Sequence, residues 1–230
     1  MPRPSRDFYD VDAQTLAERL IGMVLVRATT HGSRLAGRIV ETEAYLGPID
    51  RACHTFGGRR TERNETMWGP VGHAYVYLTY GMHHMLNVVC VEPREGQGGA
   101  AVLIRALEPI EGTSLMAEHR GLSAPRSLCS GPGKLCQALR IDRALDSTDL
   151  VTSDVLWLEL GDRPADWRVI RCSRIGVDNA GVWATRRLRW LVRAHPHVSV
   201  RAKSERAKSP SARASTTSSV NRKVGRRRPQ

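Results

Sequence analysis

The sequence has few of the features that mark membrane or secreted proteins. Its 230 residues have a mean hydropathy of −0.35, and no run approaches the roughly 18 apolar residues that a membrane helix requires. No apolar segment typical of a secretory signal peptide follows the N-terminal residues 1–5. We therefore expect a soluble protein that makes no membrane contact and stays in the cytoplasm.

Cysteine is scarce, and its spacing is typical of neither a disulfide framework nor a zinc site. The five cysteines are odd in number and form no CxxC pair. This pattern favours buried thiols in a reducing compartment. His83 and His84 are neighbours in an expected strand, so their side chains point to opposite faces. With no further Cys or His at a ligand spacing beside them, we expect no metal and no cofactor.

Acidic residues are outnumbered, and the excess positive charge is uneven. The formal net charge is +12, and residues 204–230 hold eight Lys and Arg against one Glu. This terminal segment has no periodic apolar positions, so we expect a disordered basic tail after a domain of residues 1–203. A basic chain of this kind favours a polyanionic partner.

The order of the expected elements predicts an α+β fold. A helix should start at an Asp12 N-cap and stop at Gly22, and a second helix should cover residues 134–141, with Pro132 near its first turn. Runs rich in β-branched and aromatic residues predict strands over 23–28, 35–44, 75–79, 82–91 and 101–107. A helix, then neighbouring strands, then mixed elements indicates one domain with a mostly antiparallel sheet.

The densest group of reactive side chains lies in the second expected strand. Side chains alternate along a strand, so Glu41, Glu43 and Tyr45 share one face. Two carboxylates about 6.6–6.8 Å apart on that rise are unsuited to an apolar core. One of them could line a cleft and act as a general base. The alternative is a solvated edge strand with both Glu side chains on its wet face.

A second group surrounds an expected hairpin turn. Residues 75–82 read Tyr-Val-Tyr-Leu-Thr-Tyr-Gly-Met, and Gly81 can supply the positive φ that a tight turn needs. Tyr80 at the tip of such a turn is unusual, because turns are normally polar. An exposed aromatic ring on a basic protein can wedge into a base stack. The alternative places these tyrosines in the core of a twisted sheet, which suits Tyr75 better than Tyr80.

These motifs, taken together, resemble the alkyladenine (methylpurine) DNA glycosylase family. The resemblance covers most of residues 8–200 in the order of the family. It rests on Glu41-Thr42-Glu43-Ala44-Tyr45-Leu46-Gly47-Pro48, His54, Gly57-Gly58-Arg59, Arg63-Asn64, residues 75–82 through Asn87, Arg105-Ala106-Leu107-Glu108-Pro109-Ile110-Glu111-Gly112, residues 128–139, and Arg174-Ile175-Gly176-Val177.

The resemblance implies a base-excision-repair enzyme that flips an alkylated purine out of double-stranded DNA and hydrolyses its N-glycosidic bond. It implies Glu43 as the general base, with Arg105 and the backbone carbonyl of Ile175 holding the water. By the same resemblance, Tyr45, His54 and Tyr77 wall the base pocket, Asn87 forms its floor, Tyr80 fills the gap left in the duplex, and Arg59, Arg63 and Lys134 contact phosphates. It also implies a monomer with a curved sheet, flanking helices and a protruding hairpin, similar to an RNA-binding domain attached to formyltransferases.

The lysine count indicates a monofunctional hydrolase. A glycosylase that also cleaves the strand needs an amine nucleophile, and Lys134 is the one lysine before residue 203. The alternative function is a non-catalytic nucleic-acid-binding module. A module of that kind has no need for Glu43 beside Arg105, so this pair favours the enzyme. Phe56 and the pair His83-His84 depart from the family pattern at the edge of the expected pocket.

Overall fold

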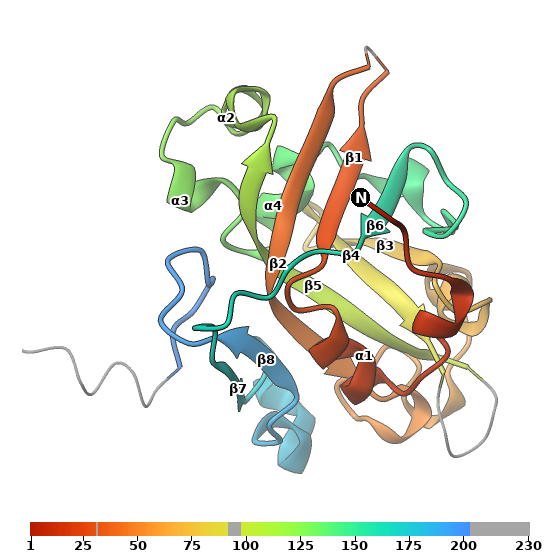
Figure 1. Ribbon diagram of the computed structural model, residues 1–230. Helices are drawn as coiled ribbons and strands as arrows, with labels where there is room; N and C mark the ends of the chain where they lie inside the picture. The colour runs from red at the N-terminus through yellow and green to blue at the C-terminus, as the bar shows by residue number, and fades with distance from the viewer. Residues whose placement is uncertain (31, 92–97, 203–230) are drawn as a thin grey trace, which may run out of the picture.

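The computed structural model describes residues 1–30, 32–91 and 98–202. In this part of the chain an antiparallel eight-stranded sheet has the order β3-β4-β5-β2-β1-β6, with β8 paired to β2 and β7 to β8 (Figure 1). The strands are β1 (Val24–Ala28), β2 (Arg34–Tyr45), β3 (Ala74–Thr79), β4 (His83–Cys90), β5 (Ala100–Glu111), β6 (Leu156–Glu159), β7 (Val169–Cys172) and β8 (Arg189–Val192). The predicted α+β class is confirmed, whereas the similarity to a formyltransferase-attached domain stays a prediction.

The two longest strands, β2 and β5, give the sheet its curvature. They pair with each other along most of their length, while β1 pairs with the first half of β2 and β8 with the second half. Register shifts at residues 39–42 mark a bulge, which increases local twist. Because β2 is paired on both sides, the alternative of a solvated edge strand is wrong.

Helix α1 (Ala13–Arg19) covers one face of β2. The Asp12 carboxylate caps it as predicted, accepting hydrogen bonds from the backbone N–H groups of Gln14 and Thr15. The Thr42 hydroxyl donates to the Ala17 carbonyl at 2.8 Å. The helix ends at Arg19, three residues before the predicted stop. Since Thr42 faces α1, the alternate residues of β2 face the opposite side.

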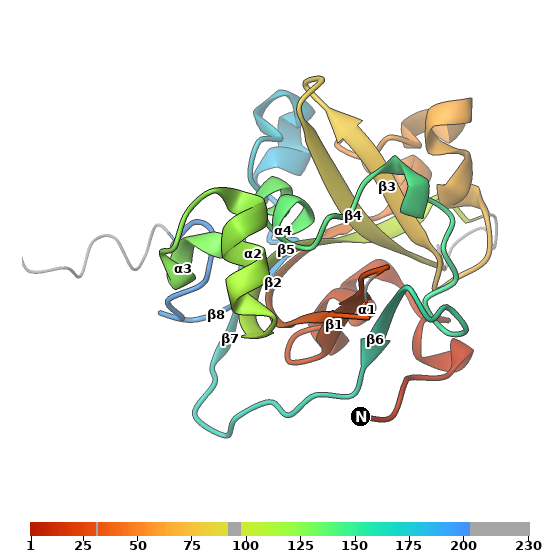
Figure 2. The ribbon, with the colours of Figure 1, turned by 90° about the horizontal axis from the view of Figure 1, so that it is seen from above.

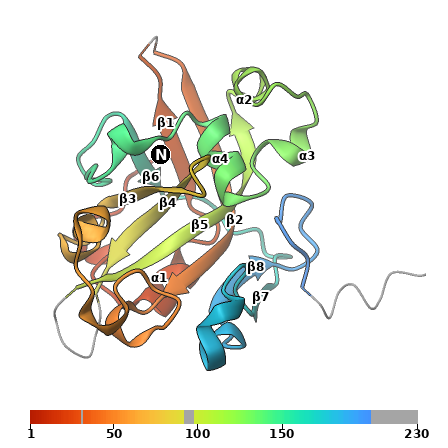
Figure 3. The ribbon, with the colours of Figure 1, turned by 180° about the vertical axis from the view of Figure 1, so that it is seen from behind.

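Three further helices form a group beside the sheet (Figure 2). They are α2 (Thr113–Arg120), α3 (Pro125–Leu128) and α4 (Pro132–Ala138). In this group α4 packs on β4 and β5, α3 contacts β5, and α2 packs on α4. Helix α4 begins two residues before its predicted start, with Pro132 in its first turn, and ends three residues early. Neither α2 nor α3 was predicted, and neither were β6, β7 and β8. Figure 3 shows β7 and β8 lying beside the end of β2.

The β3–β4 hairpin projects from the sheet, as Figure 2 shows. At its tip both Tyr80 (φ 49°) and Gly81 (φ 69°) are left-handed, and the Met82 N–H donates to the Thr79 carbonyl at 3.1 Å. This geometry matches a primed hairpin turn. The Tyr80 side chain has no core to enter, and the residue is 87% exposed. The predicted aromatic turn tip is confirmed.

Residues 204–230, where the sequence predicts a basic tail, lie outside the described residues. Within the described ranges, no helix has the length and apolar character needed to cross a membrane.

Candidate active site

A cavity of about 270 Å³ opens beside the projecting hairpin. Strands β2 to β5 and two loop segments, 52–54 and 175–177, supply its walls. It contains seven of the residues predicted from sequence: Tyr45, His54, Tyr77, Tyr80, Asn87, Arg105 and Ile175. The volume is slightly below the roughly 300–1,000 Å³ of sites for drug-sized ligands, so the cavity suits a ligand the size of one nucleobase.

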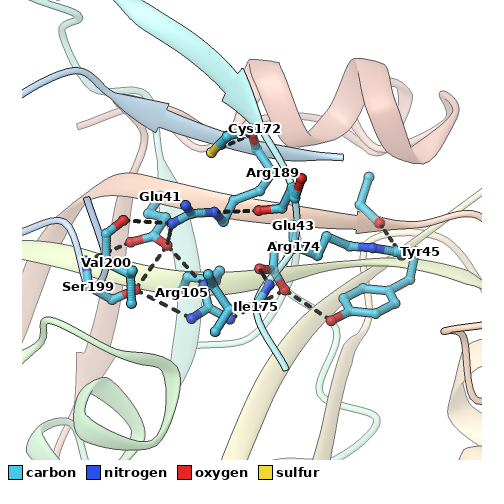
Figure 4. A network of polar contacts seen from close by, with 12 residues as sticks. Glu41, Glu43, Tyr45, Arg105, Cys172, Arg174, Ile175, Arg189, Ser199 and Val200 are labelled. Carbon is cyan, nitrogen blue, oxygen red and sulfur yellow. Dashed lines mark hydrogen bonds and ion pairs between the residues drawn. The ribbon is translucent and has the colours of Figure 1, made fainter. Parts of the chain in front are cut away.

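Glu43 lies directly behind the cavity wall and is fully buried. Three groups hold its carboxylate (Figure 4). The Ile175 N–H donates to Oε1 at 2.8 Å, the Tyr45 hydroxyl donates to Oε2 at 3.0 Å, and Arg105 Nη1 lies 3.3 Å from Oε2. Each of these residues lines the cavity. The sequence predicted a role for the Ile175 carbonyl, and the structure adds its N–H as a donor to Glu43.

Glu41 and Glu43 face the same side of β2, as predicted, because both reach Arg105. Both carboxylates are fully buried, which the sequence argument did not expect. The arginine explains how a low-polarity interior tolerates them. Burial alone would lower the pKa of Arg105, but the charges of Glu43 and Glu41 outweigh it and raise this pKa.

Aromatic rings form an uncharged wall. The rings of His54 and Tyr77 meet edge to face at 4.6 Å, and the rings of Tyr75 and Tyr77 stack at 5.3 Å. Burial, helped by the charge of Arg63, lowers the pKa of His54 to about 4. Burial, helped by the charge of Glu43, raises the pKa of Tyr77 to about 12. At neutral pH these rings carry no charge.

Tyr45 stands between the cavity and a buried ion pair. The Arg174 guanidinium lies over its ring, with Cζ 4.7 Å from the centroid, and donates to both carboxylate oxygens of Asp50 at 2.5 and 2.8 Å. Burial and the neighbouring charge of Glu43 raise the pKa of the Tyr45 hydroxyl well above its ordinary value. The hydroxyl therefore remains a hydrogen-bond donor to Glu43.

Asn87 is 4% exposed and forms part of the cavity wall. Its side-chain Nδ2 donates to the Tyr75 carbonyl at 3.1 Å, across the β3–β4 pairing. This bond fixes the amide plane. A group on β4 is thereby held rigidly at the position predicted to form the floor.

The predicted phosphate-contacting residues lie at different places around the opening. Arg59 and Arg63 are exposed and line a second hollow with Phe56, next to the His54 wall. Arg63 also donates to the Leu78 carbonyl at 3.2 Å and lies over Tyr77. Lys134 is exposed on α4 and belongs to neither hollow. The structure brings together the two arginines and leaves Lys134 apart.

Among the residues that the structure describes, the cavity has neither an amine side chain nor a metal-binding cluster in its lining. Across the described ranges, no three His, Cys, Asp or Glu side chains could jointly hold a metal ion, and no lysine lines the cavity. The terminal amine of Met1 lies 3.7 Å from Glu159 of β6, at the end of the sheet order opposite to β3. None of the five cysteines, all within the described ranges, is paired in a disulfide, and four of them are buried.

Several residues at the site were missed from the sequence. Tyr75 lies in the core, as the alternative interpretation expected, but its part in the cavity wall was missed: its hydroxyl pairs with His54 Nδ1 at 2.9 Å. A role for Arg174 could have been predicted, because it precedes Ile175 in the motif Arg174-Ile175-Gly176-Val177. Arg189, which bonds Glu41 at 2.7 Å, had none, because β8 was not predicted.

Comparison with known proteins identifies close relatives. The family described as methylpurine-DNA glycosylase matches residues 7–196. The human protein named DNA-3-methyladenine glycosylase is 45% identical over 211 residues, which cover 87% of this chain and 69% of the human protein. The mouse protein of the same name is 48% identical over 206 residues, covering 84% of this chain and 60% of the mouse protein.

A shorter archaeal relative has nearly the same extent as this chain. It comes from Methanocella arvoryzae and is 48% identical over 203 residues, covering 88% of this chain and 98% of its own length. By contrast, the chain spans about two thirds of the length of the human and mouse relatives.

Proposed function

Because the chain belongs to the methylpurine-DNA glycosylase family, we propose that it flips an alkylated purine from duplex DNA and hydrolyses its N-glycosidic bond with water activated by Glu43. The family and the names of its relatives make it an N-glycosyl hydrolase of base-excision repair that acts on DNA. The geometry around Glu43 supports the finer steps.

The reaction breaks the bond between C1′ of deoxyribose and N9 of the purine, and the electron pair leaves with the base. A purine alkylated at N3 or N7 carries a positive charge, so it departs as a neutral molecule without an acid catalyst. Water forms the new bond to C1′ and gives its proton to Glu43. The carboxylate also stabilises the positive charge that develops on the sugar.

The placement of Glu43 carries this proposal. A carboxylate oxygen can accept two hydrogen bonds, and within the described part of the chain Oε1 accepts one, from Ile175. The remaining lone pair is available to a water proton. Because Tyr45, Arg105 and Ile175 both line the cavity and hold the carboxylate, base binding and water activation occur at one place. A module that only binds DNA has no use for this arrangement.

The uncharged aromatic wall favours cationic bases in this proposal. A positively charged purine stacks on tyrosine faces by cation–π attraction, and a protonated histidine would oppose it. Since the pKa of His54 is lowered to about 4, its ring stays neutral at physiological pH. We therefore assign Tyr45, His54 and Tyr77 to stacking and hydrogen bonding with the flipped base, and the held amide of Asn87 to exclusion of the guanine exocyclic amine.

Residues around the opening of the cavity bind the DNA and help to flip the nucleotide. Tyr80 at the exposed hairpin tip fills the gap that the flipped nucleotide leaves. Arg59 and Arg63 beside the opening, and Lys134 on α4, contact backbone phosphates. The enzyme acts as a cytoplasmic monomer, and it is monofunctional because strand cleavage through a Schiff base needs an amine at the sugar.

The decisive experiment compares wild type with Glu43→Gln on duplexes that carry one 3-methyladenine, 7-methylguanine, hypoxanthine or ethenoadenine. The substitution keeps the shape of the side chain and removes the proton acceptor. We expect single-turnover base release to fall by about 10²–10⁴-fold, while binding to the same duplex changes only a few-fold.

Glu18→Gln is the matched control, since Glu18 is exposed on α1 and α1 lies on the other face of β2. It should release base at the wild-type rate. A Glu43→Gln protein that retains more than a tenth of wild-type turnover contradicts the role of Glu43 as base. Wild type that releases no base from any of the four duplexes contradicts the proposed function itself.

A further inference from the structure

Arg105 lies between two buried carboxylates and is held more closely by Glu41 than by Glu43. Its Nε donates to Glu41 Oε1 at 2.9 Å, whereas its Nη1 lies 3.3 Å from Glu43 Oε2 (Figure 4). Its Nη2 donates to the Ser199 hydroxyl at 3.3 Å. The guanidinium is thus shared between Glu41 and Glu43, and its position between the two carboxylates sets the electric field at Glu43.

Glu41 has a second arginine of its own. Arg189 Nη1 donates to Glu41 Oε1 at 2.7 Å, and the Arg189 side chain also donates to the carbonyls of Ser173 and Val200. The backbone N–H of Ser199 donates to Glu41 Oε2 at 2.7 Å, and its hydroxyl donates to Oε1 at 2.9 Å. Of the residues that bond Glu41, Arg105 lines the cavity and Arg189 and Ser199 do not, whereas Tyr45, Arg105 and Ile175 around Glu43 all line it. Glu43 is therefore better placed than Glu41 to act as the base.

The four charges form a balanced set. Glu41 and Glu43 are fully buried, and Arg105 and Arg189 are 6% and 2% exposed. In a buried site the removal of one charge leaves an uncompensated neighbour, which acts strongly on the remaining groups. The share of the Arg105 charge that acts on Glu43 therefore depends on Glu41 and Arg189, although neither touches Glu43 through a hydrogen bond.

Other ionisable groups face Glu43 from the surrounding elements. They are the Tyr45 hydroxyl on β2, Tyr77 on β3, Cys172 on β7 and Arg174, together with Arg105 on β5 and Arg189 on β8. The charge of Arg174 is matched by Asp50, and both tyrosines stay protonated because burial raises the pKa of each. Apart from Arg105, the charged groups left to act on Glu43 are therefore Glu41 and Arg189.

We propose that Glu41 and Arg189 are positioning residues for base release, because together they determine how much of the Arg105 charge acts on Glu43. This inference rests on the proposed function, in which Glu43 takes a proton from water. Glu41 draws the guanidinium away from Glu43, which leaves more of the negative charge of Glu43 free to attract the water proton. Arg189 limits this attraction by compensating part of the charge of Glu41.

The test measures single-turnover base release against pH for wild type, Glu41→Gln, Arg189→Gln and the double variant, on the duplex that wild type cleaves fastest. Glu41→Gln leaves an extra positive charge, so the acidic limb of the profile should move down by about one pH unit. Arg189→Gln leaves an extra negative charge, so the limb should move up by a similar amount. The double variant restores the balance and should return the limb to within about 0.3 pH unit of wild type.

Ser199→Ala is the neutral control from the same network. It removes hydrogen bonds to Glu41 and Arg105 without changing any charge, so it should lower the melting temperature and leave the limb in place. Because every profile uses the same duplex, titration of the lesion cancels in each comparison with wild type.

Shifts of the same sign in both single variants, no shift in either, or a double variant that stays displaced would overturn the inference. Loss of stability alone predicts fewer active molecules at every pH and no displaced limb. If a single charge deletion does not fold, Arg189→Lys and the balanced double variant still decide, since both keep the net charge and a limb displaced in either overturns the inference. Wild type without activity on any duplex would instead contradict the proposed function.

Discussion

The Arg174 guanidinium lies against the ring of Tyr45, with Cζ 4.7 Å from its centroid, while the hydroxyl of the same tyrosine donates to Glu43 at 3.0 Å. Asp50 holds Arg174 in turn through two hydrogen bonds. In the proposed mechanism, the tyrosine that stacks on the flipped base therefore also holds the general base. Changes at Tyr45 can separate these two roles.

Tyr45→Phe should keep stacking and lose the hydrogen bond to Glu43. A hydrogen bond to a charged acceptor contributes about 1.5–3 kcal/mol, and one pKa unit corresponds to about 1.4 kcal/mol. We expect the acidic limb of the single-turnover pH profile to move up by about one unit, with duplex binding unchanged.

Tyr9→Phe is the matched control for this change. Tyr9 is buried beside α1, and in the described structure its hydroxyl has no hydrogen-bond partner. Its loss should leave the profile where it is. A limb that stays in place for Tyr45→Phe as well would show that the 3.0 Å contact does not influence the base.

The pH dependence of stability should report on His54. Its folded-state pKa of about 4 lies below the ordinary 6.5, so between these values the unfolded chain binds a proton that the folded chain does not. The stabilisation is fully present above pH 6.5 and is lost as the pH falls towards 4. From pH 7 to pH 4 it amounts to at most about 3 kcal/mol.

His54→Gln removes this titration. The difference in unfolding free energy between wild type and variant should therefore shrink as the pH is lowered from 7 to 4, as measured by urea unfolding at each pH. Parallel curves would show that burial does not keep this imidazole neutral.

Local signals in the sequence identified a large part of this site, and distant contacts account for the rest. The Asp12 cap, the alternation along β2 and the aromatic turn at Tyr80 depend on neighbouring residues, and the structure confirms each. Whether the part of β2 that holds Glu41 and Glu43 lies at an edge or inside the sheet depends on β8, a strand of four residues without a clear alternating pattern. The burial of both Glu41 and Glu43 could not be foreseen for the same reason.

Arg189 and Ser199 show more clearly which parts of the site could not be predicted from the sequence. They lie 148 and 158 residues from Glu41 in sequence, and no spacing rule links them. An arginine in a basic chain is most simply expected on the surface. Its burial follows only from the fold, which places β8 beside the carboxylates.

Asn87 should determine which purines are accepted. Its amide donates to the Tyr75 carbonyl, which opposes rotation of the side chain away from a guanine exocyclic amine. Asn87→Ala opens this space. We expect release of undamaged guanine relative to hypoxanthine to rise by about tenfold or more, the scale of steric discrimination in a small pocket. An unchanged ratio, measured by chromatography of released bases, would place the guanine filter elsewhere.

Tyr80→Ala should weaken flipping and leave the chemical step intact. The side chain is 87% exposed at a turn whose backbone is fixed by the Met82–Thr79 hydrogen bond, so its loss should not unfold the domain. Loss of one base–aromatic contact should cost about 1–3 kcal/mol. Excision from a mismatched or abasic-opposed site, where unstacking costs less, should suffer less than excision from a well-paired site. Equal losses on both would contradict the wedge role.

The basic segment 204–230 should strengthen DNA binding through charge alone. It carries eight Lys and Arg against one Glu, and each neutralised phosphate contributes about −0.9 to the slope of log K against log salt concentration. If about half of these cations contact phosphates at once, truncation after Ala202 should make the slope shallower by about 3–4 units. Affinity should fall at low salt, while single-turnover release at saturating enzyme stays unchanged, because the residues around Glu43 all precede the truncation. A truncated protein with the full-length slope on naked DNA would contradict this role and favour a protein partner for the segment.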